Sequence, residues 1–161
     1  MVNAWILTLP WKAIDSLSRK HGINPVIVGA IVMQESAGNT SATRYEENYR
    51  WLLHPDRYSS MNNISRMTEV NQQKTSWGLM QVMGGVAREL GFEGPLVDLC
   101  KPEIGIDLGI KKLMQLKEKY KDNINDVLAS YNAGSPRLLA SGDYVNQYYV
   151  NSVNKYIKEL L

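Results

Sequence analysis

The run over residues 26–33 is apolar on every face of a helix, and it constrains the fold more than any other part of the chain. Asn24 followed by Pro25 supplies an N-cap and a first helical residue, so we expect a helix to begin there. A helix that is apolar all round is stable only when other elements cover it. The sequence therefore predicts a central, buried helix that ends near Glu35, an ionisable side chain after an apolar run.

Apolar residues recur at helical spacing along most of the remaining chain. Together with residues that start and stop helices, they predict further helices over residues 10–22, 79–90, 102–120, 127–134 and 149–160. The periodicity fades between residues 37 and 76, where Asn, Ser, Thr and Arg are frequent. About 40 residues without structure are unusual in a compact domain, so we expect short strands or single helical turns there. The predicted fold is mainly α, with a small irregular or β insertion.

The length of 161 residues is enough to bury one continuous core, and the sequence contains neither an internal repeat nor a linker. We therefore expect residues 1–161 to form a single domain and to be monomeric. The formal net charge of +2 argues against a dedicated nucleic-acid-binding protein. Cys100 is the only cysteine, so an intramolecular disulfide is impossible and a buried structural thiol is expected.

The first ten residues carry no basic segment, and the chain contains no run of about 18 apolar residues. We expect neither a signal peptide nor a stable association with a membrane. If the substrate lies outside the cytoplasm, another protein must deliver this one, or the cell must be opened.

Glu35 is a candidate general acid because of its place at the end of a buried helix. Burial disfavours the charged carboxylate, and so does the negative end of the helix dipole, so both effects raise its pKa. A carboxylic acid that stays protonated near neutral pH can donate a proton to a departing oxygen and later take one back. The alternative is a surface glutamate at a fraying helix end.

Other catalytic constellations are weak. His21 and His54 are the only histidines and no HExxH motif occurs, so we expect no zinc site, and no other metal or organic cofactor. The G-x-S-x-G motif and the Gly-rich phosphate-binding motifs are also absent. The Gly84-Gly85 pair lies in an apolar run and indicates a close approach between elements or a kink. A solvated helix face explains a set of lysines better than a binding patch does: Lys111, Lys112, Lys117, Lys119 and Lys121.

The aromatic residues are unusual in kind, with 9 Tyr, 4 Trp and 1 Phe. Nearly all of these rings carry a polar group. Such rings suit a wet cleft in which they stack on sugars, and they also suit the edge of a core. The composition leaves both interpretations open.

Four short motifs in order resemble those of soluble lytic transglycosylases. They are Glu35-Ser36 at the end of the apolar helix, GLMQVM over residues 78–83, ASYNAG over residues 129–134 and YVNSV over residues 149–153. From about Pro10 to the C-terminus the chain is similar to the SLT domain of glycoside hydrolase family 23, which is related to goose-type lysozymes, and especially to its bacteriophage members. The resemblance implies a lysozyme-like helical fold. It also implies cleavage of the β-1,4 bond between N-acetylmuramic acid and N-acetylglucosamine in peptidoglycan.

The same resemblance implies roles for individual residues. Glu35 corresponds to the catalytic acid and base, and Tyr149 to a tyrosine whose hydroxyl points toward that glutamate. Further positions resemble substrate contacts or the lining of the cleft near the scissile bond: Ser76, Met80, Gln81, Tyr131 and Asn132. Met80 and Tyr131 also fit helical core spacing, whereas Gln81 is a polar residue in an apolar run and is harder to explain by packing.

One carboxylate suffices for cleavage when the substrate supplies its own nucleophile. In a transglycosylase, Glu35 protonates the glycosidic oxygen while the muramoyl N-acetyl group stabilises the cationic sugar. Glu35 then removes the proton of the C6 hydroxyl, which closes a 1,6-anhydro ring.

A hydrolytic muramidase is the main alternative, and it needs a second carboxylate to activate water. Glu46 lies in the Arg44-Tyr45-Glu46 run, which resembles a run found in phage members, and Glu47 and Asp56 are nearby. An ion pair from Glu46 to Arg44 or Arg50 is the structural alternative for this residue. A non-catalytic wall-binding or virion structural protein that kept the fold is a third interpretation of the chain.

The biological setting is open at the level of sequence. A small domain of this kind suits a phage endolysin that is released through holin pores. An enzyme carried in a virion, or one from a conjugation system, has the same features. In each case the expected partner is a peptidoglycan glycan strand.

Overall fold

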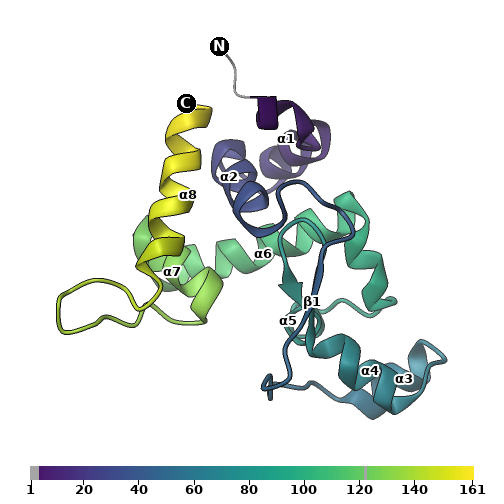
Figure 1. The fold of residues 1–161 in the computed structure, drawn as a ribbon. Coiled ribbons are helices and arrows are strands. Elements are labelled where there is room, and N and C mark those ends of the chain that lie inside the picture. Colours follow the sequence, from purple (N-terminus) through teal and green to yellow (C-terminus); the bar gives the residue numbers. More distant parts are fainter. Residues whose placement is uncertain (1–3, 122) are drawn as a thin grey trace.

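The computed structural model describes residues 4–121 and 123–161, so residues 1–3 of the N-terminal segment considered above lie outside it. After a short 3-10 helix over Ala4–Thr8, five α-helices form the larger part of the molecule (Figure 1). They are α1 (Trp11–Lys20), α2 (Pro25–Ser36), α6 (Pro102–Lys119), α7 (Ile124–Ala133) and α8 (Gln147–Leu160). Helix α2 packs against α1 and α8, while α6 packs against α1 and α7.

Helix α2 is the predicted central helix. The side chain of Asn24 accepts a hydrogen bond from the backbone N–H of Val26 at 2.9 Å, so the expected N-cap is confirmed. Residues 28–32 are buried. Trp11 of α1 packs directly on Gly29, where an added Cβ would lie 2.5 Å from Cη2 of the indole. The helix is therefore covered on several sides, as its apolar sequence requires.

The segment between α2 and α6 holds a small antiparallel sheet and short helices. The strands β1 (Thr43–Tyr45), β2 (Thr75–Trp77) and β3 (Val82–Met83) lie in the order β1-β2-β3. The helices are α3 (Pro55–Met61), α4 (Arg66–Gln73) and α5 (Gly84–Glu89), followed by a 3-10 helix over Leu96–Cys100. The expected short strands are present. Helices α3 and α4 exceed the single turns that were expected, because each starts at its own signal, Pro55 and the N-cap Ser65.

The prediction of one helix over residues 79–90 is wrong. Gly78 and Gln81 have positive φ angles of +68° and +48°, which produce a tight turn between β2 and β3. Leu79, Met80 and Val82 are buried around this turn, so the apolar run fills the core from a turn and a strand rather than from a helix. A short continuous apolar run does not distinguish these possibilities.

Gly84 and Gly85 are sites of close approach, as predicted. A Cβ at Gly84 would lie 2.2 Å from the carbonyl oxygen of Gln72, at the end of α4. A Cβ at Gly85 would lie 2.6 Å from Oη of Tyr49 and 2.7 Å from the carbonyl oxygen of Trp51. Only glycine allows α5 to pack this tightly against α4 and the chain after β1.

A fully buried ion pair joins α4 to α5. Glu69 and Arg88 are both 0% exposed at their side chains, and Arg88 donates from Nε and Nη2 to the two carboxylate oxygens at 2.8 and 2.9 Å. Gln73 donates to the same carboxylate at 2.9 Å. The remaining Arg88 nitrogen, Nη1, donates to the carbonyl oxygens of Phe92 and Gly94, each at 2.8 Å. This pair gives the insertion a polar centre of its own.

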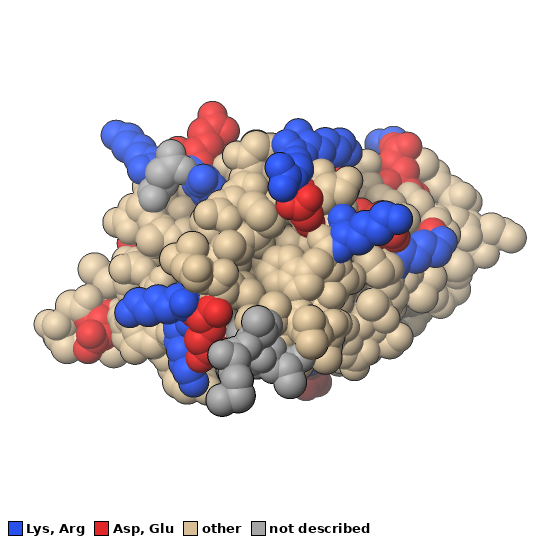
Figure 2. Space-filling view, turned by 90° about the horizontal axis from the view of Figure 1, so that it is seen from above, with Lys and Arg blue, Asp and Glu red and all other residues tan. Residues whose placement is uncertain are grey.

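The surface charges are mixed. On the face seen in Figure 2, basic and acidic side chains are interspersed, in keeping with a net charge of +2. Cys100 is a free thiol but is only partly buried, which differs from the expected buried position because the 3-10 helix ends there, at the surface. No helix in the described part of the chain is both long enough and apolar enough to cross a lipid bilayer.

Candidate active site

The C-terminal end of α2 brings Glu35 to the wall of a cleft of about 820 Å³. The cleft is also lined by residues from the end of β1 and the chain after it, the β2–β3 turn, α5, α6 and α7. The hydroxyl of Ser36 donates to the carbonyl oxygens of Val32 and Leu79, at 3.1 and 2.8 Å. These bonds fasten the end of α2 to the β2–β3 turn and so fix the position of Glu35.

Tyr149 of α8 makes a short hydrogen bond to the carboxyl group of Glu35. Its Oη donates to Oε1 of Glu35 at 2.6 Å, and the tyrosine is only 6% exposed. Burial raises the pKa of Glu35 above its usual range, while the Tyr149 hydrogen bond and the charges of Lys112 and Arg44 partly oppose this. Burial and the charge of Glu35 raise the pKa of Tyr149 far above 10, so its hydroxyl stays a donor at neutral pH.

Tyr131 lines the cleft, but Met80 does not. The hydroxyl of Tyr131 donates to the carbonyl oxygen of Met80 at 2.9 Å. The Met80 side chain is 0% exposed and packs on Gly109, where an added Cβ would lie 2.4 Å from its sulfur. The expected substrate contact of the Met80 side chain is therefore not supported, because the side chain fills the core and only its carbonyl is tied to a cleft residue.

Ser76 and Gln81 both line the cleft, and they are bonded to each other. Ser76 Oγ donates to Gln81 Oε1 at 2.8 Å, and Gln81 Nε2 donates to the carbonyl oxygens of Gly78 and Ala42 at 2.8 and 2.9 Å. This explains why a polar residue occurs within the apolar run. Its amide holds the β2–β3 turn closed and links it to the chain just before β1.

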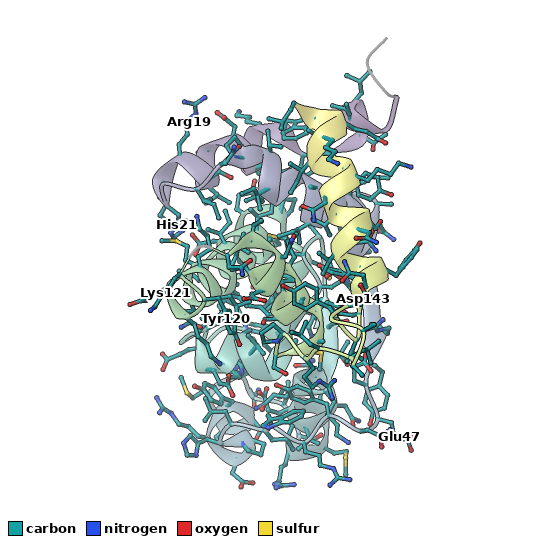
Figure 3. The ribbon with its side chains drawn as sticks, turned by 90° about the vertical axis from the view of Figure 1, so that its left-hand side faces the viewer. Arg19, His21, Glu47, Tyr120, Lys121 and Asp143 are labelled. Atoms are coloured by element: carbon teal, nitrogen blue, oxygen red, sulfur yellow. The ribbon has the colours of Figure 1, made fainter. Side chains whose placement is uncertain are left out.

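Asn132 and Glu46 are also in the cleft lining. Asn132 Oδ1 accepts a hydrogen bond from Nδ2 of Asn146 at 2.9 Å. Glu46 forms an ion pair with Nε of Arg44 at 2.5 Å, so the expected ion pair is present beside the cleft. The other two candidate carboxylates lie elsewhere: Glu47 is exposed at the edge of the molecule (Figure 3), and Asp56 is paired with Arg66 on the surface.

A family model described as the transglycosylase SLT domain matches residues 12–152. The chain belongs to this family. The SLT family is one of lytic transglycosylases, so the resemblance at the level of the enzyme family and the predicted fold class are both confirmed.

Two relatives illustrate the range of this similarity. "Membrane-bound lytic murein transglycosylase E" of Buchnera aphidicola subsp. Baizongia pistaciae (strain Bp) is 25% identical over 164 residues, which cover 97% of this chain and 68% of that protein. The X-ray structure of an inactive glutamate-to-glutamine mutant of lytic transglycosylase Slt from Pseudomonas aeruginosa aligns with a TM-score of 0.57 and 21% identity. That match covers 91% of this SLT domain and 23% of Slt, and it shows that the fold is shared.

Lys112 lines the cleft of the SLT domain, so the prediction of a solvated face is wrong for this lysine. Its Nζ donates to the carbonyl oxygen of Tyr131 at 2.7 Å and lies 4.0 Å from the centre of the Tyr131 ring. Burial lowers the pKa of Lys112 to about 8, although the charge of Glu35 opposes the shift. Helical spacing contained a signal, because Lys112 follows the buried Leu108 and Gly109 by one turn.

The SLT domain also has an aromatic wall that the sequence analysis did not assign to the site. Trp51 lines the cleft and is 69% exposed, and its ring meets Tyr49 edge-on at 5.4 Å. Burial and the neighbouring Glu89, a further carboxylate in the cleft lining, raise the pKa of Tyr49 to about 12. The excess of Tyr and Trp in the composition was the available signal, but it did not say which rings face the cleft.

No histidine is among the described residues that line this cleft. His21 lies at the end of α1 (Figure 3), with Nε2 2.7 Å from Oδ1 of Asp107. Within residues 4–121 and 123–161, no group of three His, Cys, Asp or Glu side chains is placed to hold a metal ion.

Proposed function

We propose that this SLT domain is a peptidoglycan lytic transglycosylase that cleaves the β-1,4 bond between N-acetylmuramic acid and N-acetylglucosamine and forms a 1,6-anhydro product. The observation that carries the proposal is the carboxyl group of Glu35, which faces a cleft, has its pKa raised by burial and is bonded to Tyr149. The names of both relatives, lytic transglycosylases, support it. The Slt relative was inactivated by replacing one glutamate with glutamine, in keeping with an essential carboxyl group.

In the first step, the protonated Glu35 donates its proton to the glycosidic oxygen. The bond between that oxygen and C1 of the muramic acid breaks, and the N-acetylglucosamine side leaves with a hydroxyl group. The carbonyl oxygen of the muramoyl N-acetyl group stabilises the positive charge that develops at C1. A second protein carboxylate is not needed for this step.

In the second step, the Glu35 carboxylate removes the proton of the C6 hydroxyl of the same sugar. The C6 oxygen bonds to C1 and displaces the N-acetyl oxygen, so the 1,6-anhydro ring closes and Glu35 is again protonated. Tyr149 donates a hydrogen bond to the carboxylate that exists between the two steps, and this bond stabilises that form. Ser76, Gln81, Tyr131 and Asn132 form the walls against which the glycan binds.

A hydrolytic muramidase is the second candidate, and the other carboxylates of the cleft lining favour it. Glu46 and Glu89 both line the cleft, and either one would have to activate a water molecule. Glu46 is already engaged in an ion pair with Arg44, which weakens the case for it as that base.

Mass spectrometry of the fragments released from purified peptidoglycan tests the proposal. A transglycosylase releases muropeptides with 1,6-anhydro ends. Because water is not added, these products are lighter than hydrolysis products by one water molecule, about 18 Da. Reducing ends would establish the muramidase instead. Binding to the wall in a sedimentation assay without any release of fragments would show a non-catalytic protein.

We further propose that the enzyme acts as a phage lysin on the wall of its host, either at the end of infection or as part of a virion. The similarity of the Arg44-Tyr45-Glu46 run to phage members supports this setting. Expression in a bacterium with and without a co-expressed holin tests the endolysin form. Lysis that depends on the holin is expected. Lysis at the same rate without it would contradict release through holin pores.

A further inference from the structure

Lys112 occupies an unusual position for a lysine, partly buried in the wall of the cleft. Its ammonium group donates to the carbonyl oxygen of Tyr131 at 2.7 Å and rests on the ring of the same residue, 4.0 Å from its centre. Tyr131 lies in the last turn of α7, where carbonyl groups lack partners within the helix and the helix dipole favours a cation. These contacts hold the charge of Lys112 in one place.

Burying the charged ammonium group of Lys112 costs free energy, and this cost is not needed merely to satisfy the carbonyl group at the end of α7. Burial lowers its pKa to about 8, so near neutral pH the protein maintains a positive charge in an environment that disfavours it. A water molecule or a neutral side chain can satisfy a helix carbonyl at the edge of a cleft. The opposing influence on Lys112 is the charge of Glu35, which raises the pKa of the lysine. The two groups therefore interact across the cleft wall.

The groups around Glu35 make Lys112 the main cation that acts on it. Tyr149 from α8 and Tyr131 from α7 both have pKa values far above 10 and remain neutral. Arg44 from β1 also acts on Glu35, but its side chain is 73% exposed and is paired with Glu46. The remaining charged groups of the cleft lining are Glu89 and Arg137. Water screens the exposed Arg44, whereas Lys112 acts through a medium of lower dielectric constant.

We propose that Lys112 is a positioning residue whose fixed positive charge stabilises the carboxylate that Glu35 becomes after it gives its proton to the glycosidic oxygen. Lys112 donates its hydrogen bond to Tyr131 and acts on Glu35 through charge, so Glu35 remains free to exchange its proton with substrate. The inference rests on the proposed role of Glu35 as acid and base. In this arrangement Tyr149 supplies the hydrogen bond to the carboxylate, and Lys112 supplies the compensating charge.

The test compares Lys112→Gln with Lys112→Arg. Glutamine keeps a donor for the Tyr131 carbonyl but removes the charge, whereas arginine keeps both. The carboxyl carbon of Glu35 is titrated by NMR without substrate, and kcat/KM is measured against pH on peptidoglycan. Lys111→Gln is the matched control, because Lys111 is the neighbouring lysine of α6 and is paired with Asp107 outside the cleft lining. Melting temperatures show whether each variant folds.

In Lys112→Gln, we expect the Glu35 titration and the alkaline limb of kcat/KM to move together to higher pH, because the carboxylate is less stable. At the pH optimum kcat should fall about tenfold, the effect of losing one charge interaction in a partly buried site. Lys112→Arg and Lys111→Gln should retain the native titration. An unchanged Glu35 titration in a folded Lys112→Gln overturns the inference, and so does a shifted titration that the rate profile does not follow.

Failure of this inference is distinct from failure of the proposed function. The Glu35 titration is observed without substrate, so it reports the charge interaction even if the protein is not a transglycosylase. Full activity of Glu35→Gln would instead refute the proposed function. Should Lys112→Gln fail to fold, Lys112→Met provides a second uncharged variant, with its thioether against the Tyr131 ring.

Discussion

Two glutamates of this SLT domain, one fully buried and one partly buried at the cleft, have opposite surroundings. Glu69, in α4 of the insertion, is 0% exposed, and both its oxygens accept hydrogen bonds from Arg88 while Gln73 adds another. Glu35, at the end of α2, opens to the cleft and accepts a hydrogen bond from Tyr149, a neutral donor. One carboxylate is locked in an ion pair, whereas the other has a cation nearby that bonds to another group.

The difference shows how a protein separates structural from reactive carboxylates. Glu69 is paired directly with a guanidinium, and removal of either charge would leave the other one buried without a counter-ion. Glu35 has a neutral donor and a charge that acts at a distance, so either protonation state is tolerated. Burial alone therefore does not identify a catalytic acid, and the kind of partner decides.

Replacing Glu35 should have the largest effect on function. Glu35→Gln removes the transferable proton but keeps the shape of the side chain, so turnover of peptidoglycan should fall by about 10² to 10⁴-fold. The measurement is the rate of muropeptide release from purified walls. The melting temperature should not fall, because Tyr149 can still donate to the amide oxygen. A variant that is folded and fully active would contradict the assignment of Glu35.

Replacing Glu69 should have the largest effect on stability. Glu69→Gln leaves the guanidinium of Arg88 buried with a neutral partner, and the loss in free energy of unfolding should be about 3 to 5 kcal/mol. Denaturant titration measures this loss, with Glu35→Gln as the matched control at the other carboxylate. The double change of Glu69 and Arg88 to methionine should recover part of the stability, since neither charge is then left unpaired. A loss below about 1 kcal/mol in Glu69→Gln would place the pair among weak surface ion pairs.

The same two regions differ in how well sequence alone could predict them. Helix α2 carries its own start signal and an apolar run long enough to require burial, so its bounds and the position of Glu35 were predicted from local information. Glu69 and Arg88 come from different helices, and nothing local distinguishes either one from a surface charge. Their pairing depends on how α4 packs against α5. The incorrect prediction of one helix over residues 79–90 does not give this packing.

The cleft shows a similar division. The motifs led to residues that the structure gathers around one cleft, including Ser76, Gln81, Tyr131 and Asn132. The run of lysines around Lys112 predicts a solvated face, while the position of Lys112 depends on the helix face that it shares with Leu108 and Gly109. Trp51 lies in a segment without periodicity, where no pattern indicates the direction of a side chain.

Tyr149 sharpens the comparison between the two glutamates, because it is the neutral counterpart of Arg88. Tyr149→Phe removes the hydrogen bond that lowers the pKa of Glu35, so that pKa should rise further. The acid form then persists to higher pH, and the alkaline limb of kcat/KM should move the same way. We expect kcat to fall about tenfold to hundredfold, as for loss of one preorganised donor. An alkaline limb that stays in place, or moves to lower pH, would show that the hydroxyl does not act on Glu35.

Trp51 should give the smallest effect, and one confined to binding. The exposed ring stands on the part of the cleft formed by the chain after β1 and the α5 face, not beside the proton-transfer groups that act on Glu35. If it stacks on a sugar ring, Trp51→Ala should raise KM about twofold to tenfold, the equivalent of about 0.5 to 1.5 kcal/mol for an aromatic contact, and leave kcat within about twofold. Trp51→Phe keeps an aromatic face, so its KM should lie between those of the native protein and Trp51→Ala. The comparison with Glu35→Gln separates the roles, since one change weakens binding without altering the pH profile and the other removes turnover. If Trp51→Ala instead lowers kcat with KM unchanged, the ring acts on the reacting groups. Trp51 and Glu35 would then not have the separate roles in binding and in proton transfer that we assign to them.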